Sequence, residues 1–218
     1  MSGRDAILGK LRQNVKRDGA APDERITTPA RGIVPARSDL DRDGQVALFV
    51  DEAEKVDASI ARLNGAEAIP AAVARYLEDA GLDTAARIAP HPMLQGLDWA
   101  GAGMTVDEGN SDGGDVAAVT VAIAGVAESG TLVLTSDPQT PTTLNYLPDA
   151  ALVVLREADM VGAYEDVWDQ LRQQGGNFMP RNVNWVTGPS RTGDIEQTLL
   201  LGVHGPRTLH VLLVRDDG

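Results

Sequence analysis

The stretch VNWVTGPSRTGDIEQTLLLGVHGPRTLHVLLV, residues 183–214, decides the predicted fold of this 218-residue chain. Val183–Val186 and Leu209–Val214 are short, mainly apolar runs that predict buried strands, and Gly193–Leu201 between them has the length and spacing of a helix. Runs of this kind are typical of parallel strands with helices on both sheet faces. The stretch therefore predicts an α/β fold built on a mostly parallel sheet.

The alternation of strand and helix patterns extends back to about residue 46. Strands that alternate with helices of roughly 10–15 residues predict a three-layer α/β/α sandwich. Further strands or short apolar runs are predicted at residues 46–50, 66–69, 85–89, 104–106, 116–123, 131–135 and 150–155, and helices at residues 52–63, 71–80 and 158–173.

The first 44 residues differ from the rest of the chain. Residues 4–17 place apolar side chains at helical spacing and predict an amphipathic helix. Residues 18–44 are rich in Pro, Gly, Asp and Arg and show little periodicity, which indicates an extended arm. We therefore expect an N-terminal helix and arm over residues 1–44 and a single α/β domain over residues 45–218.

Composition excludes several classes of partner. The net charge is −13, with 19 Lys and Arg residues in no cluster. Nucleic-acid binding needs clustered cations, so we expect neither nucleic acid nor an anionic membrane surface as a partner. No apolar window approaches the length of a membrane span. The N-terminus lacks the apolar run of a signal peptide, so we expect a cytoplasmic location.

The chain has no cysteine and three histidines, of which His91 has no obvious partner. It therefore supplies no disulfide, no thiolate nucleophile and no Cys ligand for zinc or an iron–sulfur cluster, and we expect no metal site. Nucleotide motifs also fail. Gly101 and Gly103 precede Val106 where the dinucleotide fingerprint needs a glycine, and Thr131 stands where a P-loop needs its lysine. The sequence thus names no cofactor.

The turn GPSRT at residues 188–192 joins a predicted strand to a predicted helix. Free N–H groups and the positive end of a helix dipole suit an anion, and Arg191 adds a bidentate clamp for carboxylate or phosphate. The alternative is that Ser190 caps the helix while Asp194 and Glu196 complement its dipole. A serine-hydrolase elbow is not supported, because the pattern G-x-S-x-G lacks its last glycine.

A second turn, ESGT at residues 128–131, precedes a predicted strand and is the expected partner of the first. Glu128 is a candidate general base or acyl nucleophile, and the alternative is a solvated loop carboxylate. Ser129, Gly130 and Thr131 are candidate ligand-binding residues, with plain turn residues as the alternative.

A third polar segment, HGPR at residues 204–207, follows the predicted helix. His204 and Arg207 either meet a ligand, with His204 transferring a proton, or neutralise the negative end of the helix. Gly205 joins Arg207 as a ligand-binding candidate. His210 alternates with apolar residues and is predicted to be structural.

These turns belong to three segments, GVAESGTLVL (125–134), LNYLPDAALVVL (144–155) and GPSRTGDIEQTLLLGVHGPRTLHVLLV (188–214), in which the chain resembles the LUD-domain family and its lactate-utilisation protein C group. The resemblance implies a fold similar to the sugar-phosphate isomerase and CoA-transferase superfamily. It also implies a role in oxidising L-lactate to pyruvate, beside companion proteins that carry the redox machinery. The family's motif residues that carry over are Glu128, Ser129, Gly130, Thr131, Ser190, Arg191, Asp194, Glu196, His204, Gly205 and Arg207.

We therefore expect a subunit of an L-lactate utilisation system, with a pocket for a small anionic ligand and no redox centre of its own. Its expected partners are companion iron–sulfur proteins and that ligand, and homo-oligomer formation is left open. Two alternatives remain. The chain is a non-catalytic assembly or regulatory subunit, or it is an acyl- or CoA-transferase-like enzyme that uses Glu128 as its nucleophile.

Overall fold

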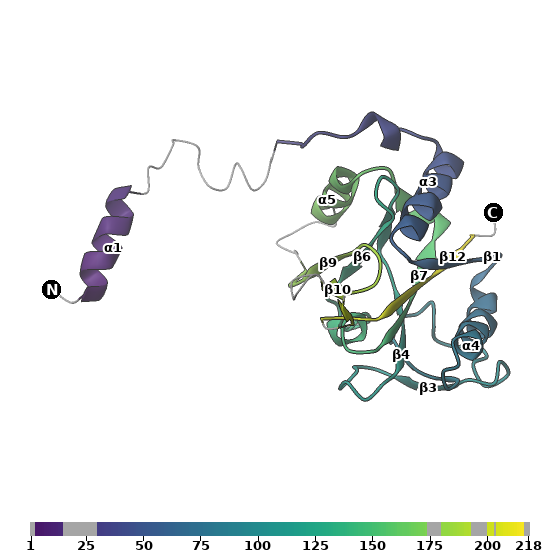
Figure 1. Cartoon of the computed structure of the whole chain (residues 1–218). Coiled ribbons are helices and arrows are strands. Elements are labelled where there is room, and N and C mark those ends of the chain that lie inside the picture. The colour runs from purple at the N-terminus through teal and green to yellow at the C-terminus, as the bar shows by residue number, and fades with distance from the viewer. Residues whose placement is uncertain (1–2, 15–29, 174–179, 193–199, 203, 216–218) are drawn as a thin grey trace. The chain divides into compact units, whose positions relative to one another are not determined.

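The chain divides into two compact units, residues 1–33 and 34–218. In the first unit, α1 (Gly3–Asn14) forms where the apolar spacing predicts a helix. The predicted domain division at residue 44 stays a prediction. The computed structural model, drawn in Figure 1, describes residues 3–14, 30–173, 180–192, 200–202 and 204–215.

The second unit is built around a six-stranded sheet in which every neighbouring pair is parallel. The order across this sheet is β1 (Ser59–Leu63), β12 (Thr208–Val214), β7 (Ala150–Arg156), β4 (Ala117–Val121), β2 (Ala85–Ile88) and β3 (Thr105–Glu108). Every residue of β4 is buried, and in β7 all are buried except Arg156. The predicted α/β fold with a parallel sheet is therefore confirmed.

Both faces of the parallel sheet are covered, and β7 shows how. Successive side chains of a strand point to opposite faces. Leu152 packs in the same core as helix α4 (Ile69–Asp79), whereas the next residue, Val153, packs in the same core as helix α3 (Arg42–Lys55). Each face thus has its own apolar core, which explains why the central strands are continuous apolar runs.

A second sheet lies over the α3 side of the parallel sheet and was not predicted (Figure 1). Its order is β8 (Met160–Val161), β5 (Ala124–Val126), β6 (Thr131–Thr135) and β9 (Val183–Val186). β6 is antiparallel to both β5 and β9. Leu132 and Leu134 of β6 join the core that contains Val153, while Val133 packs with helix α5 (Tyr164–Gln173) on the outer side. The strand at 183–186 is therefore real, but it belongs to this second sheet.

The predictions for residues 46–63 placed strand and helix in the wrong order. Residues 46–50 lie inside α3, and the strand β1 comes after it. The Asp41 carboxylate caps α3 by accepting from the N–H of Gly44 at 2.9 Å. Val46, Phe49 and Ala53 then follow at helical spacing and are buried. A run of four or five apolar residues did not distinguish this buried helical face from a strand.

Three further predicted elements differ from the structure. Residues 66–69 form a 3₁₀ turn and the start of α4, not a strand. The helix predicted from residue 158 begins at Tyr164, because Met160–Val161 pairs with β5. The helix predicted over 193–201 does not reach its end, because β11 (Leu200–Leu201) pairs with β10 (Arg191–Thr192). Residues 193–199 lie outside the described part of the chain.

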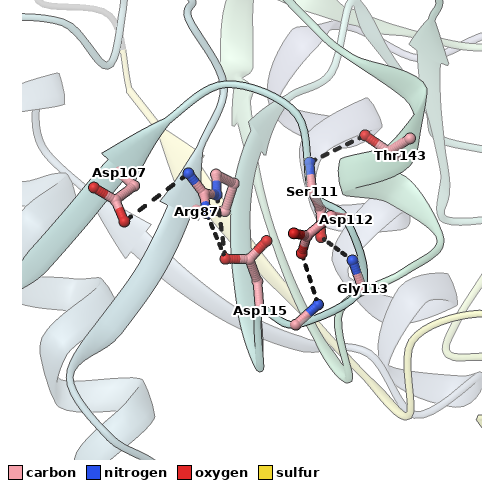
Figure 2. Close-up of polar contacts among 8 residues, drawn as sticks. Arg87, Asp107, Ser111, Asp112, Gly113, Asp115 and Thr143 are labelled. Atoms are coloured by element: carbon pink, nitrogen blue, oxygen red, sulfur yellow. Dashed lines mark hydrogen bonds and ion pairs between the residues drawn. The ribbon is translucent and has the colours of Figure 1, made fainter.

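The loop between β3 and β4 is held by a polar network (Figure 2). The Arg87 guanidinium contacts the carboxylates of Asp115 at 3.1 Å and Asp107 at 3.9 Å. Burial opposes ionisation of Asp115, yet hydrogen bonds from Arg87 and Ser111 and the Arg87 charge keep its pKa below the usual value. The N–H of Ser111 donates to Thr143 Oγ1 at 3.2 Å. The network therefore ties this loop to the short 3₁₀ helix η3 (Thr142–Asn145).

His210 is a buried side chain at the edge of the sheet core, with 7% of its surface exposed. Its ring stacks on Tyr76 with centroids 4.3 Å apart, and its Nδ1 lies 2.8 Å from Ser59 Oγ. Burial lowers the pKa of His210 to about 4. The native protein therefore keeps this ring neutral at pH values where an unfolded chain protonates it.

This difference predicts a pH dependence of stability. As pH falls from about 6.5 to about 4, the unfolded chain gains a proton at His210 that the native state excludes, so the free energy of unfolding falls by an amount on the order of 3 kcal/mol. His210→Phe keeps a stacking ring without a titrating group and should remove this part of the decline. Urea unfolding of both proteins at several pH values measures it. Parallel pH profiles for the two proteins would show that His210 is not responsible.

Candidate functional site

The 128–131 turn contacts the residue that precedes the 188–192 turn. Thr131 begins β6 and Thr187 follows β9, and their hydroxyl oxygens lie 2.7 Å apart. Thr131 Oγ1 is also 2.8 Å from the hydroxyls of Ser129 and Tyr164, and Ser129 Oγ donates to Tyr164 Oη at 2.8 Å. We call Ser129, Thr131, Tyr164 and Thr187 the hydroxyl cluster. It links the 128–131 turn, the start of α5 and the 188–192 turn.

Both turns approach the C-terminal end of α3 more closely than a side chain would allow. A Cβ atom on Gly130, which has a φ of +62°, would lie 2.3 Å from the backbone nitrogen of Ala53. On Gly188, with a φ of +74°, it would lie 2.4 Å from the carbonyl oxygen of Val56. Only glycine combines the left-handed backbone with this approach. The backbone of α3 therefore fixes where both turns sit.

Glu128 is buried in the fold, with 7% of its surface exposed. Its Oε1 accepts a hydrogen bond from the N–H of Tyr164 at 3.2 Å, so the carboxylate caps the N-terminus of α5. The alternative, a solvated loop carboxylate, is therefore wrong, because the side chain is a buried cap. Its predicted role as base or nucleophile stays a prediction.

No helix begins at Ser190–Arg191, because Arg191 belongs to the short strand β10. The N–H of Ser190 donates to Pro206 O at 2.8 Å, so it is occupied by the protein. The Ser190 carbonyl accepts from the N–H of Gly202 at 3.1 Å. The 188–192 turn and the 204–207 segment therefore lie side by side. The backbone N–H of Ser190 is hydrogen-bonded to the protein and is not free, as it would be at the N-terminus of a helix.

The two candidate arginines are exposed and paired with carboxylates. Arg191 forms an ion pair with Asp57, the residue at a φ of +63° after α3. Arg207 Nε lies 3.4 Å from Asp149 Oδ1. His204 is exposed. Gly205 lies against Ser190, since a Cβ on it would be 3.3 Å from Ser190 Cβ, whereas the candidates Asp194 and Glu196 lie outside the described residues.

A cavity between the two sheets gathers all three segments that carry the family resemblance. We call it the inter-sheet cavity. Its volume is about 20 Å³. It is lined by Thr120, Leu134, Asn145, Ala151, Val153, Val186, Gly188, Pro189, Ser190, Pro206 and Leu209.

Sequence reasoning missed the polar groups at this cavity. Thr120 stands alone in the apolar strand AAVTV, and Asn145 lies in η3. Within the described residues, Thr120 Oγ1 and both polar atoms of the Asn145 amide have no hydrogen-bond partner, although both residues are buried. A polar residue inside a predicted central strand was the available signal for Thr120. Nothing in the sequence marked Asn145.

His91 lies in a separate cleft at the carboxyl ends of β2 and β4. The sequence alone indicated no partner for this residue. The cleft measures about 350 Å³ and also contains Thr140 and the paired Arg156 and Asp159. Burial lowers the pKa of His91, with the charge of Asp137 acting in the opposite direction. His91 Nδ1 accepts from the N–H of Met93 at 3.2 Å, so a neutral ring carries its proton on Nε2.

No group of three or more His, Asp or Glu side chains in the described part of the chain is arranged to hold a metal ion. No helix in the same residues is both long and apolar enough to cross a membrane.

Comparison with known proteins identifies the family. The model of the LUD domain matches residues 46–214. This chain belongs to the LUD domain family. The matched region contains both turns and the whole lining of the inter-sheet cavity.

Relatives in this family carry two kinds of name. The chain is 26% identical over 210 residues to "Lactate utilization protein C" of Bacillus subtilis, covering 91% of this chain and 82% of that protein. It is 36% identical over 94 residues to the uncharacterized protein YkgG of Escherichia coli, covering 42% and 41% of the two chains. An uncharacterized Neisseria meningitidis protein is 37% identical over 95 residues, which span 40% of its length.

The fold also matches a solved structure. A crystal structure of a DUF162 family protein from Deinococcus radiodurans superposes with a TM-score of 0.57 at 24% identity, covering 80% of this chain and 99% of that one. At this identity the match supports the fold alone.

The glycine contact with α3 generates a stability prediction. Gly130→Ala should lower the free energy of unfolding by about 3 kcal/mol or more, because the methyl group meets the Ala53 backbone in a strained conformation. Gly96→Ala is the matched control: its φ is +76° but no atom lies within 4 Å, so it should cost only about 1 kcal/mol. Denaturant unfolding measures both variants. Equal losses would show that the α3 contact adds nothing to the conformational strain.

Proposed function

We propose that this protein serves in L-lactate utilisation and binds a small anionic ligand there. The observation that carries the proposal is the match over 91% of this chain to a relative named Lactate utilization protein C. The chain has no cysteine to hold an iron–sulfur cluster. Oxidation of lactate to pyruvate releases two electrons, and in this proposal companion iron–sulfur proteins receive them.

We place the anion at the mouth of the inter-sheet cavity. Ser190 and Pro206 line that cavity, and each is followed in the chain by an arginine, Arg191 and Arg207. Both arginines are exposed, and so are their carboxylate partners. Exposed ion pairs contribute little free energy, so a ligand carboxylate exchanges with them at small cost. Arginine also offers the forked geometry that binds a carboxylate through two hydrogen bonds.

We propose Glu128 and His204 as the residues that transfer protons. The surroundings of their side chains differ. His204 is exposed and lies close in the sequence to Pro206, which lines the inter-sheet cavity. Glu128 holds the start of α5 through the N–H of Tyr164. The transferase alternative makes Glu128 a nucleophile, and the burial of its carboxylate makes that alternative less favourable.

A non-catalytic assembly subunit is the second candidate. The capping role of Glu128 and the ion pairs at Arg191 and Arg207 favour it, because each candidate group already has a structural partner. The two candidates differ in their dependence on Arg191 and Arg207. Only ligand binding requires these charges.

A growth experiment tests the proposal. In the native host, deletion of the gene should abolish or strongly slow growth on L-lactate and leave growth on glucose unchanged. The wild-type gene should restore it, and the double variant Arg191→Ala/Arg207→Ala should not. Arg75→Ala is the matched control, because it removes another exposed, ion-paired arginine on α4. Normal lactate growth of the deletion strain would refute the role in lactate utilisation. Full rescue by the double variant would refute the anion site.

A further inference from the structure

Two hollows adjoin at the carboxyl ends of the parallel strands, apart from the inter-sheet cavity. The first is the cleft of about 350 Å³ that contains Arg156 and Asp159, and the second measures about 190 Å³. Both are lined by His91, Ile123 and Thr140, so they form one recess, which we call the His91 cleft. Neither hollow shares a lining residue with the inter-sheet cavity. Its size is in the range of small-molecule sites, about 300–1,000 Å³.

The order of the parallel strands favours ligand binding at this place. From β2 the chain continues to β3 on one side, and from β4 it continues, within this sheet, to β7 on the other side. Open α/β sheets bind ligands at the carboxyl ends of strands whose connections diverge in this way. His91 follows β2, Ile123 follows β4 and Arg156 ends β7. The His91 cleft therefore lies at the topological switch point of the sheet.

His91 supplies a hydrogen-bond donor to the cleft. Its Nδ1 accepts from the N–H of Met93 at 3.2 Å, so the neutral ring carries its proton on Nε2. Burial lowers the pKa of His91, which favours the neutral ring. Nε2 has no hydrogen-bond partner among the described residues, and with its proton it has no lone pair for a metal ion. The group that satisfies Nε2 is therefore an acceptor oxygen of a ligand.

Charges of opposite sign flank His91. Burial has the largest effect on the pKa of His91, and beyond it the charge of Asp137 raises that pKa and the charge of Arg156 lowers it. Asp137 lines the second hollow and has no ion-pair partner among the described residues, and its Oδ1 accepts from the N–H of Gln139 at 2.8 Å. Asp159 fixes the Arg156 guanidinium in the first hollow through Nε at 2.7 Å and Nη2 at 2.8 Å. The cleft thus places a neutral donor between an anion and a cation.

The floor of the first hollow is apolar. Met93, Val121 and Ile123 line it together with Ala122. Removing apolar surface from water is favourable, so this floor stabilises an aliphatic group of a ligand. The polar groups lie around the floor and not within it, which leaves room for a charged head group beside His91.

These groups select a zwitterion with an aliphatic side chain. A carboxylate accepts from His91 Nε2 and is attracted by Arg156, while an ammonium group donates to Asp137. An α-amino acid carries both charged groups and its side chain on one carbon. We infer that the His91 cleft binds a free aliphatic α-amino acid. This site is separate from the proposed anion site, and its ligand differs from a simple anion by the ammonium group that Asp137 recognises.

Three probes that share an isobutyl group test the inference by titration calorimetry of the full chain. L-Leucine carries both charges, 4-methylpentanoate lacks the ammonium group and L-leucinamide lacks the carboxylate. At about pH 6.5, where an α-amino group is protonated, leucine should bind about tenfold more tightly than either analogue, because each analogue leaves one charge of the cleft without a partner. No binding of leucine, or equal binding of leucine and 4-methylpentanoate, would overturn the inference.

Asp137→Asn separates recognition of the ammonium group from a structural role. The asparagine retains an oxygen that accepts from the N–H of Gln139, so the turn should keep its fold, but it has no charge. Its affinity for leucine should fall about tenfold, and its affinity for 4-methylpentanoate should not fall. Asp83→Asn, a change at an exposed aspartate that lines neither hollow, is the matched control and should bind leucine as wild type does. Wild-type affinity of Asp137→Asn for leucine would contradict the assignment.

His91→Asn tests the donor. An asparagine retains a side-chain acceptor for the N–H of Met93, two residues further on, and lacks Nε2. Leucine should bind this variant several fold more weakly than wild type. If the variant does not fold, nitrogen NMR of the wild-type histidines replaces it: leucine should shift the Nε2 resonance of His91 and leave that of His210 in place. An unmoved His91 resonance would contradict the inference, and none of these results bears on growth on lactate.

Discussion

The site depends on how closely two glycine turns approach the end of α3. Gly130 and Gly188 each place backbone where a Cβ would lie within 2.4 Å of the α3 backbone. This approach seats the second sheet on the parallel sheet, with Leu132 and Leu134 in the shared core. The second sheet is the outer wall of the inter-sheet cavity, because Leu134 and Val186 line it. Two positions without side chains therefore determine whether the cavity has a second wall.

The sequence predicts the parallel sheet well because its signal is local. β4, β7 and β12 are buried on both faces, and that environment requires a continuous apolar run that can be read without knowing the neighbours. The predicted order of strand and helix over residues 46–63 was wrong because the apolar run there is buried on one side only. Val46 and Phe49 are buried on one helical face, and a short apolar run there has no feature that excludes a strand. The strands at 131–135 and 183–186 were predicted, but a short apolar run does not show which sheet its strand joins, so the second sheet was missed.

The functional roles predicted for the site residues stay predictions. The structure places Thr131, in the 128–131 turn, beside Thr187, the residue before the 188–192 turn. The chemistry expected of Ser190 was not recovered, since its N–H bonds Pro206 and no helix starts there. Asn145 was invisible in the sequence because an asparagine near a turn is ordinary. Its significance lies in being buried without a partner, which is a property of the packed structure.

In the proposed function, the exposed side chains of Arg191 and Arg207 hold the carboxylate of a small ligand in place of their partners Asp57 and Asp149. The most direct test is a crystal structure of the protein with L-lactate at a resolution that separates a ligand from water. We expect lactate with its carboxylate oxygens within about 3 Å of the guanidinium nitrogens of Arg191 or Arg207. A cavity that holds only an ordered water, with lactate absent or bound elsewhere, would contradict it.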